Sequence, residues 1–195
     1  MQQSQILELF KPENEIERAI VDSEVFRTAS QFRTHGRSHP ERLVYVHIQQ
    51  ILAFIDRQLW LSYRTALRQL ALTHDLGKYF VMRDAQGKVV GGGHGTISER
   101  IAENFIKDPR ILYAIRIHDK YVHFYWDEQK GKRFDERRFR RVFGAPDAGL
   151  ATLTRFNYAD SNSRKKDSII WFEDRCVELG LKAEKVYISE PGVLL

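Results

Sequence analysis

The chain is dominated by segments in which apolar residues recur at intervals of three and four, the spacing of amphipathic helices. In one such segment, a single helix face carries Leu43, His47, Ile51 and Phe54. Proline and glycine residues separate these segments, and few stretches alternate as strands do. The pattern therefore predicts an all-α helical bundle, and it points His47 toward the interior of that bundle.

The remaining expected elements follow from the same spacing and from capping residues. The first predicted helix begins at Pro12, has Ile16 on its inner side and ends before His35. A second opens at Ser38 and Pro40, and a third runs from about Ser62 to His74, with Gly77 placed to end it. A fourth carries Ile97 to Phe105, and a fifth is capped by Asp108-Pro109 and ends near His118. The last three are Asp135 to Phe143, a helix that Asp147 caps and that carries Leu150 to Asp160, and Asp167 to Leu179. A polar stretch over 119–134 and an extended tail over 185–195 are expected outside them. The segment from Phe80 to Gly93 is rich in turn-forming residues and predicts a short hairpin or Gly-rich loop inserted into the bundle.

The length of 195 residues suits one domain, 1–195, with a core from about residue 38 to residue 180. The N-terminal helix and the C-terminal tail are expected to pack on this core. A single cysteine, Cys176, excludes an internal disulfide, and the first residues lack the regions of a signal peptide. No apolar run is long enough to span a bilayer. These features predict a cytoplasmic protein that does not enter the membrane.

Ligand-type side chains lie on or at the ends of separate predicted helices. These are His47, His74, Asp75 and Asp160. Because the inner faces of the helices must converge, the carboxylates would be buried, and burial of an unpaired carboxylate is unfavourable unless a cation compensates it. Imidazole and carboxylate donors suit a divalent cation. The formal charge of +5 favours an anionic ligand in addition.

The order of these residues resembles the HD superfamily of metal-dependent phosphohydrolases. His47, then His74-Asp75 within LALTHDLGK, then Asp160 within NYADSN follow the pattern of that family. The region from Ser38 to Asp167 is similar to the HD region of bacterial tRNA nucleotidyltransferases, in His94-Gly95, Ile117-His118 and Ala159-Asp160. The chain is also similar to the HD-type dinucleoside polyphosphate hydrolases, which are among the family members that have histidines at the positions of His94 and His118. The long Gly-rich hairpin and the basic segment after residue 129 depart from that group, so its substrate is not carried over.

The resemblance implies an HD-domain helical bundle with one or two divalent metal ions. The first would be held by His47, His74, Asp75 and Asp160, and Asp75 would bridge to a second held by His94 and His118. The family does not distinguish manganese, iron, nickel, zinc or magnesium. Two alternatives stay open: His39 competes with His47 as the first ligand, and His94 and His118 could contact a substrate phosphate instead of a metal.

The resemblance further implies that Asp75 and Lys78 are catalytic, with Lys78 neutralising a phosphate oxygen. Other candidate phosphate-binding residues are Arg42, Arg100, Lys120, Arg155 and Arg164. The basic segment 130–141, interleaved with Phe134 and Phe139, is either a solvated helix face or a nucleic-acid-binding patch.

The expected function is therefore hydrolysis of a phosphomonoester or phosphodiester, most of all in a nucleotide, by attack of a metal-bound hydroxide. One alternative is an RNA-directed or cyclic-nucleotide phosphodiesterase. The other is a non-catalytic nucleotide-sensing module that keeps the metal site. The expected partner is thus a phosphate-bearing small molecule, with nucleic acid as a second possibility through the basic segment.

Overall fold

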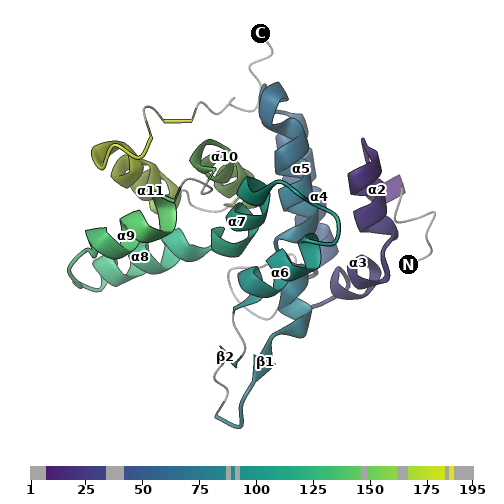
Figure 1. Cartoon of the computed structure of the whole chain (residues 1–195), viewed down its shortest axis with the longest axis horizontal. Helices are drawn as coiled ribbons and strands as arrows, with labels where there is room; N and C mark the ends of the chain where they lie inside the picture. Colours follow the sequence, from purple (N-terminus) through teal and green to yellow (C-terminus); the bar gives the residue numbers. More distant parts are fainter. Residues whose placement is uncertain are drawn as a thin grey trace.

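The structure is a computed structural model, and it describes residues 8–33, 42–86, 89–90, 93–145, 149–161, 167–182 and 185–186. Within these residues the chain forms an all-α bundle, as predicted (Figure 1). The predicted opening of the second helix at Ser38 and Pro40, the Asp147 cap and most of the C-terminal tail lie outside the described residues. No helix of the described segments is both long enough and apolar enough to cross a membrane.

The N-terminal region contains two helices, α2 (Glu15–Asp22) and α3 (Glu24–Ala29), where the sequence predicted one. Ser23 separates them because its hydroxyl accepts a hydrogen bond from the Phe26 amide and so caps the second helix. Ile16, which was predicted to face inward, is exposed. The single N-terminal helix was therefore a wrong prediction, since Ser23 can cap a new helix as well as occupy a helix interior.

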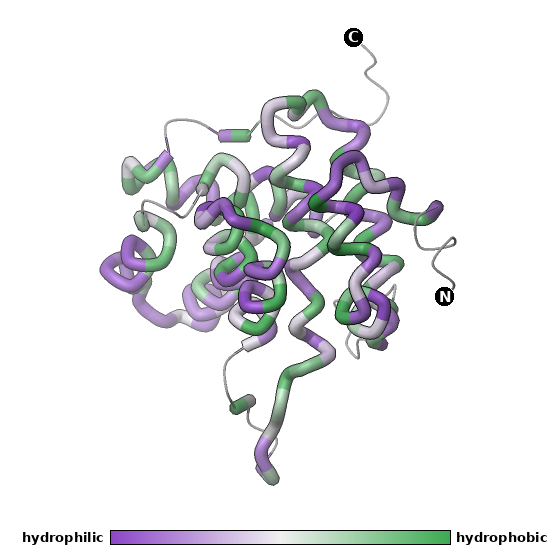
Figure 2. Tube along the Cα trace, turned by 45° about the vertical axis from the view of Figure 1, so that its right-hand side comes forward, coloured by the Kyte–Doolittle hydropathy of each residue, from purple (hydrophilic) through white to green (hydrophobic). Residues whose placement is uncertain are grey.

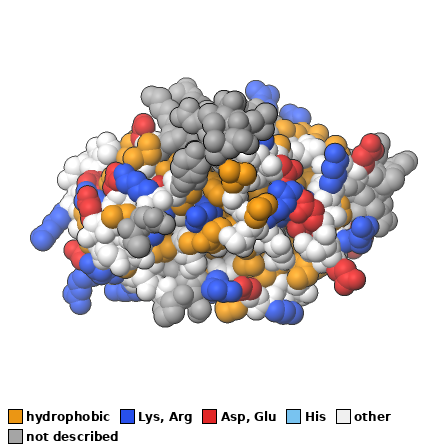
Figure 3. All heavy atoms as spheres, turned by 90° about the horizontal axis from the view of Figure 1, so that it is seen from above, with side chains coloured by type: hydrophobic (Ala, Val, Ile, Leu, Met, Phe, Trp, Pro, Cys, Tyr) orange, Lys and Arg blue, Asp and Glu red, His pale blue; other side chains and the backbone are white. Residues whose placement is uncertain are grey.

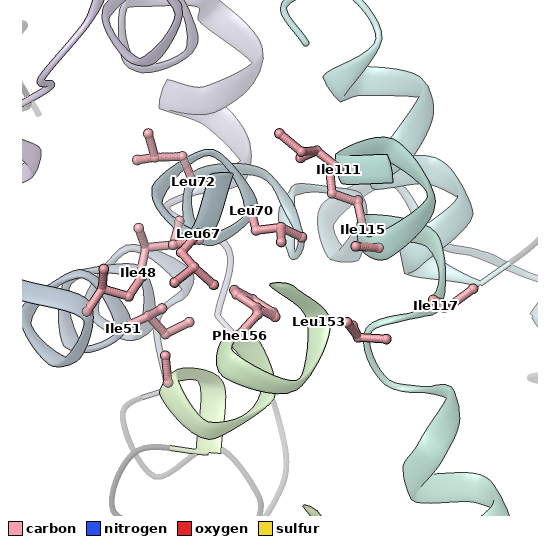
Figure 4. Packing of buried hydrophobic residues seen from close by; sticks show 14 of the residues in the cluster. Ile48, Ile51, Leu67, Leu70, Leu72, Ile111, Ile115, Ile117, Leu153 and Phe156 are labelled. Atoms are coloured by element: carbon pink, nitrogen blue, oxygen red, sulfur yellow. The ribbon is translucent and has the colours of Figure 1, made fainter. Parts of the chain in front are cut away.

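The centre of the bundle is built from helices close to the predicted ranges. They are α4 (Val44–Asp56), the short 3-10 turn η1 (Leu61–Tyr63), α5 (Arg64–Thr73), α6 (His94–Ala102), α7 (Pro109–Ile117) and α10 (Leu150–Ser161). Their apolar faces meet in one core, and Figure 4 shows Leu67 and Leu70 of α5 between the side chains of α4, α7 and α10. Helix α5 packs against α2, α4, α7 and α10, so it is the central element.

The segment after α5 continues as a 3-10 helix, η2 (Leu76–Phe80), and then as two short strands. Strand β1 (Met82–Arg83) pairs in antiparallel fashion with β2 (Val89–Val90). Figure 1 shows these strands projecting away from the helices, within the region that the sequence marked as a hairpin or Gly-rich loop.

The C-terminal half adds α8 (Lys120–Gln129), α9 (Glu136–Phe143) and α11 (Asp167–Glu178), on the side of the bundle opposite α2 and α3 (Figure 1). Helix α8 occupies the polar stretch that was predicted to lie outside the helices. It forms because Tyr121 and Phe124 bury their rings in the core despite the polar residues around them. Figure 2 shows the resulting mixture of hydrophobic and hydrophilic residues along each helix.

Candidate metal centre

Helix ends bring the predicted ligands together. His74 caps the C-terminus of α5, His118 caps the C-terminus of α7, and Asp160 lies in the last turn of α10. The N-terminal ends of the same three helices line one common hollow, so the helices run in the same direction. Their carbonyl ends, which carry partial negative charge, therefore point toward the cluster and favour a cation there.

The first group of side chains surrounds one oxygen of each aspartate. His47 Nε2 lies 2.7 Å from Asp160 Oδ1 and 3.9 Å from Asp75 Oδ2. His74 Nε2 lies 3.3 Å from Asp75 Oδ2 and 3.6 Å from Asp160 Oδ1. His47 is 2% exposed and His74 is 1% exposed, so the predicted inward orientation of His47 is correct.

The second group lies on the other oxygen of Asp75. His94 Nε2 and His118 Nε2 lie 3.5 Å and 3.8 Å from Asp75 Oδ1, and 3.2 Å from each other. Donor atoms that share one cation at bond lengths of about 2.0–2.2 Å stand roughly 3 to 4.3 Å apart. The separations given above fit this range, except for the shorter His47–Asp160 contact, which has the length of a hydrogen bond. The ligand atoms of His47, His74 and Asp75 form one mutually close set, and those of Asp75, His94 and His118 form another.

Backbone carbonyls fix the tautomers of two histidines. The carbonyl oxygen of Ala71 lies 3.1 Å from His74 Nδ1, and that of Ile115 lies 2.7 Å from His118 Nδ1. Because a carbonyl can only accept, Nδ1 carries the proton in both rings. Held in this way, each ring presents Nε2 to the cluster, which is the arrangement that a metal-binding histidine requires.

Two buried polar atoms of the cluster have no hydrogen-bond partner among the described residues. They are His74 Nε2 and Asp75 Oδ1. Each belongs to a side chain that is almost fully buried, and leaving such atoms unpaired is unfavourable by about 1 to 3 kcal/mol. His74 Nε2 faces oxygens of Asp75 and Asp160, and Asp75 Oδ1 faces the nitrogens of His94 and His118, so each group of the cluster can hold a metal ion.

The surroundings also set the charge states. Although burial raises it, interactions with His74 and Lys78 hold the pKa of the Asp75 carboxyl well below its usual range. Burial, reinforced by the neighbouring His118, lowers the pKa of His94 to about 4, and burial also lowers the pKa of His118. Near pH 7 the carboxylate is thus charged and both imidazoles are neutral, which are the forms that bind metals.

Close helix packing places His94 beside Asp75. A side chain at Gly77 would put a Cβ atom 2.2 Å from the carbonyl oxygen of His94 and 2.8 Å from the Ser98 nitrogen. The Gly77 amide instead donates a hydrogen bond of 2.8 Å to the Ser98 hydroxyl. The sequence suggested that Gly77 ends the preceding helix, but its role in the structure is to let η2 and α6 approach. The sequence contained no signal for Ser98.

Two charged side chains border the cluster. Lys78 Nζ lies 2.6 Å from Asp75 Oδ2, so the predicted catalytic lysine lies against the predicted catalytic aspartate. Asp119 Oδ2 lies 3.9 Å from His94 Nε2, and its Oδ1 atom is buried without a hydrogen-bond partner among the described residues. The only signal for Asp119 in the sequence is its position directly after the predicted ligand His118.

The other phosphate-binding candidates are not gathered at the cluster. Lys120 contacts a residue that borders the cluster, because its Nζ atom lies 3.7 Å from Asp119 Oδ1. Arg155 instead stacks its guanidinium 3.9 Å from the centre of the Tyr63 ring, near the opposite ends of the helices. Arg42 and Arg100 are exposed, and the structure gives neither a contact with the cluster. Arg164 and the competing ligand His39 lie outside the described residues.

The basic segment 130–141 has its aromatic rings turned inward. Phe139 is fully buried, and Phe134 packs against Phe139 and Trp171. Arg140 pairs with Glu136, and Arg138 lies over the Phe124 ring. Figure 3 shows Lys and Arg side chains scattered among acidic and hydrophobic ones on one face of the molecule. Binding of nucleic acid by this segment stays a prediction.

No family model, curated protein or solved structure matches the chain. The likeness to the HD superfamily therefore rests on the residues themselves and on their order.

Proposed function

We propose that this chain is a metal-dependent phosphohydrolase that acts on a phosphomonoester or phosphodiester of a nucleotide. The observation that carries the proposal is the buried Asp75 carboxylate, which faces His74 through one oxygen and the pair His94 and His118 through the other. A carboxylate with imidazole nitrogens on both sides offers two adjacent cation positions. His74 Nε2 and Asp75 Oδ1, which have no hydrogen-bond partner among the described residues, support the proposal.

The residues of the cluster would have two roles: the histidines and aspartates would bind the cations, and Lys78 would stabilise charge on the substrate. His47, His74, Asp75 and Asp160 would hold the first cation, and Asp75, His94 and His118 the second. When bound, a divalent cation lowers the pKa of a coordinated water and screens the charge on phosphate oxygens. The ammonium of Lys78 would stabilise charge that develops on a nonbridging phosphate oxygen. The backbone carbonyls of Ala71 and Ile115 keep two of the imidazoles in the required tautomer.

The test measures hydrolysis for each combination of a metal and a substrate. Metal-stripped protein is supplied in turn with manganese, iron, nickel, zinc or magnesium, and phosphate release is measured from mononucleotides, dinucleoside polyphosphates, cyclic nucleotides and short RNA. We expect metal-dependent turnover that Asp75→Asn abolishes and Asp127→Asn, an exposed aspartate on α8, leaves unchanged. Selective cleavage of RNA or cyclic nucleotides would favour a phosphodiesterase. Nucleotide binding without turnover would favour a sensing module, and failure to bind any metal would overturn the proposal.

A further inference from the structure

Two aromatic side chains next to the candidate metal centre are exposed. Tyr79 is 47% exposed and Phe80 is 40% exposed, and their ring centres lie 4.8 Å apart in an edge-to-face arrangement. Both directly follow Lys78 in the 3-10 helix η2. Burying an aromatic ring is strongly favourable, so a solvent-facing pair beside a charged cluster calls for a partner.

The geometry of η2 places this pair on either side of Lys78. Side chains three residues apart eclipse in a 3-10 helix, so Phe80 shares the side of Gly77, which packs on His94 and Ser98 of α6. Tyr79 turns toward the end of α3, where its ring centre lies 6.1 Å from that of Phe32.

The two aromatic residues adjoin Lys78, which borders the charged cluster, along η2. Lys78 directly precedes the two aromatic residues in the sequence and reaches Asp75 with its ammonium group at 2.6 Å. Met82, which is 69% exposed on β1, extends the apolar surface away from the cluster. A ligand whose phosphate lies at Lys78 would therefore have its remaining atoms beside aromatic rings.

We infer that Tyr79 and Phe80 form a platform for a planar aromatic group of the substrate. The inference rests on the proposed function and deepens it by naming the side chains that would bind an aromatic ring of the substrate, such as the base of a nucleotide. Stacking of a ring on an aromatic side chain contributes enough binding energy to set such a preference. Tyr79 and Phe80 would determine specificity, whereas Lys78 and the metal ligands would act on the phosphate.

The test compares three substrates that share a phosphomonoester: adenosine monophosphate, phenyl phosphate and glycerol phosphate. In Tyr79→Ala and Phe80→Ala, kcat/KM should fall about tenfold for the substrates with a ring and stay within about twofold for glycerol phosphate. The conservative variants Tyr79→Phe and Phe80→Tyr should restore the preference. Trp126→Ala, which removes an exposed ring on α8, is the matched control and should change nothing. A loss confined to adenosine monophosphate would show that the platform selects a nucleobase.

Equal losses on all three substrates would mean that the rings only support the fold, and no loss on any would mean that they do not contact substrate. Either result overturns the inference and leaves the proposed function standing. If none of the three is hydrolysed, calorimetric titration of the manganese-loaded protein with adenosine monophosphate replaces turnover. Binding that weakens about tenfold in the alanine variants supports the platform. Absence of binding, or binding that the variants do not weaken, overturns it.

Discussion

The buried ion network around Arg68 and the buried His/Asp cluster differ in how completely their polar atoms are paired. Arg68 is 2% exposed and donates hydrogen bonds to Glu17 at 3.0 Å and to the carbonyl oxygens of Phe10 and Lys11. Glu17, fully buried, also accepts from the Glu13 amide and the Asn14 side chain. The network joins the N-terminal segment to α5 and is complete within the protein.

The cluster at the C-terminal end of α5 has a buried centre but is incomplete. His74 Nε2 and Asp75 Oδ1 have no hydrogen-bond partner among the described residues, although carboxylate oxygens and imidazole nitrogens surround them. One helix thus supports a closed network that stabilises the fold and an open one that is suited to a cation. This comparison indicates that buried polar atoms without hydrogen-bond partners, more than buried charge alone, distinguish this candidate site from the Arg68 ion pair.

The largest effect expected from this comparison is on the closed network. Arg68→Met should lower the free energy of unfolding by about 3 to 5 kcal/mol, because it leaves Glu17 charged and buried without its partner. Arg64→Met is the control, since Arg64 pairs near the surface and should contribute about 1 kcal/mol or less. Chemical denaturation of the metal-free protein measures both. A cost for Arg68→Met as small as that for Arg64→Met would contradict the assigned role of the network.

Lys78→Ala tests whether the open cluster acts on substrate. Because the change removes a positive charge but no metal ligand, metal content should persist while turnover falls by about 10- to 1,000-fold. Lys107→Ala, an exposed lysine after α6, should have no effect. Metal analysis and initial rates on the purified variants give the answer. Full activity of Lys78→Ala would exclude a role for Lys78 in turnover, and loss of metal would assign it to holding Asp75.

Gly77→Ala tests whether the close approach of η2 and α6 positions His94 for metal binding. Its Cβ atom would collide with the His94 carbonyl, so the variant should lose about 1 to 3 kcal/mol of stability and bind less metal at His94 and His118. Gly93→Ala is matched to it, because a Cβ atom there meets nothing within 4 Å. Thermal unfolding and metal stoichiometry distinguish the variants. Equal behaviour would show that the close approach of η2 and α6 does not position His94.

The smallest expected effect is a pH dependence. The pKa of His94 is lowered to about 4 from a usual value of 6.5, so the unfolded chain binds a proton more readily than the folded one. Stability of the metal-free protein should therefore decrease as the pH falls from about 6.5 toward 4, by on the order of 1 to 3 kcal/mol. His94→Gln should flatten this dependence, and His123→Gln, an exposed residue of α8, should preserve it. An unchanged slope in His94→Gln would be inconsistent with a neutral, buried His94.

Periodicity predicted the helices of the bundle centre because their apolar faces repeat regularly, and it oriented His47 correctly. It missed α8, where two buried rings outweigh a polar sequence, and the break at Ser23, where a hydroxyl caps a new helix. The order of the histidines and aspartates predicted which side chains meet. The sequence could not predict that Gly77 serves a close helix contact or that Asp119 borders the cluster, because both depend on packing between elements.

The measurement that tests the central claim most directly is the stability of metal-stripped protein with and without added divalent cations. If the open cluster binds a cation, manganese, iron, nickel, zinc or magnesium at about 100 times its dissociation constant should raise the free energy of unfolding by about 2.7 kcal/mol. Asp75→Asn should abolish this gain, and Asp127→Asn should keep it. Failure of every cation to stabilise the wild-type protein, or equal stabilisation of Asp75→Asn, would contradict the account.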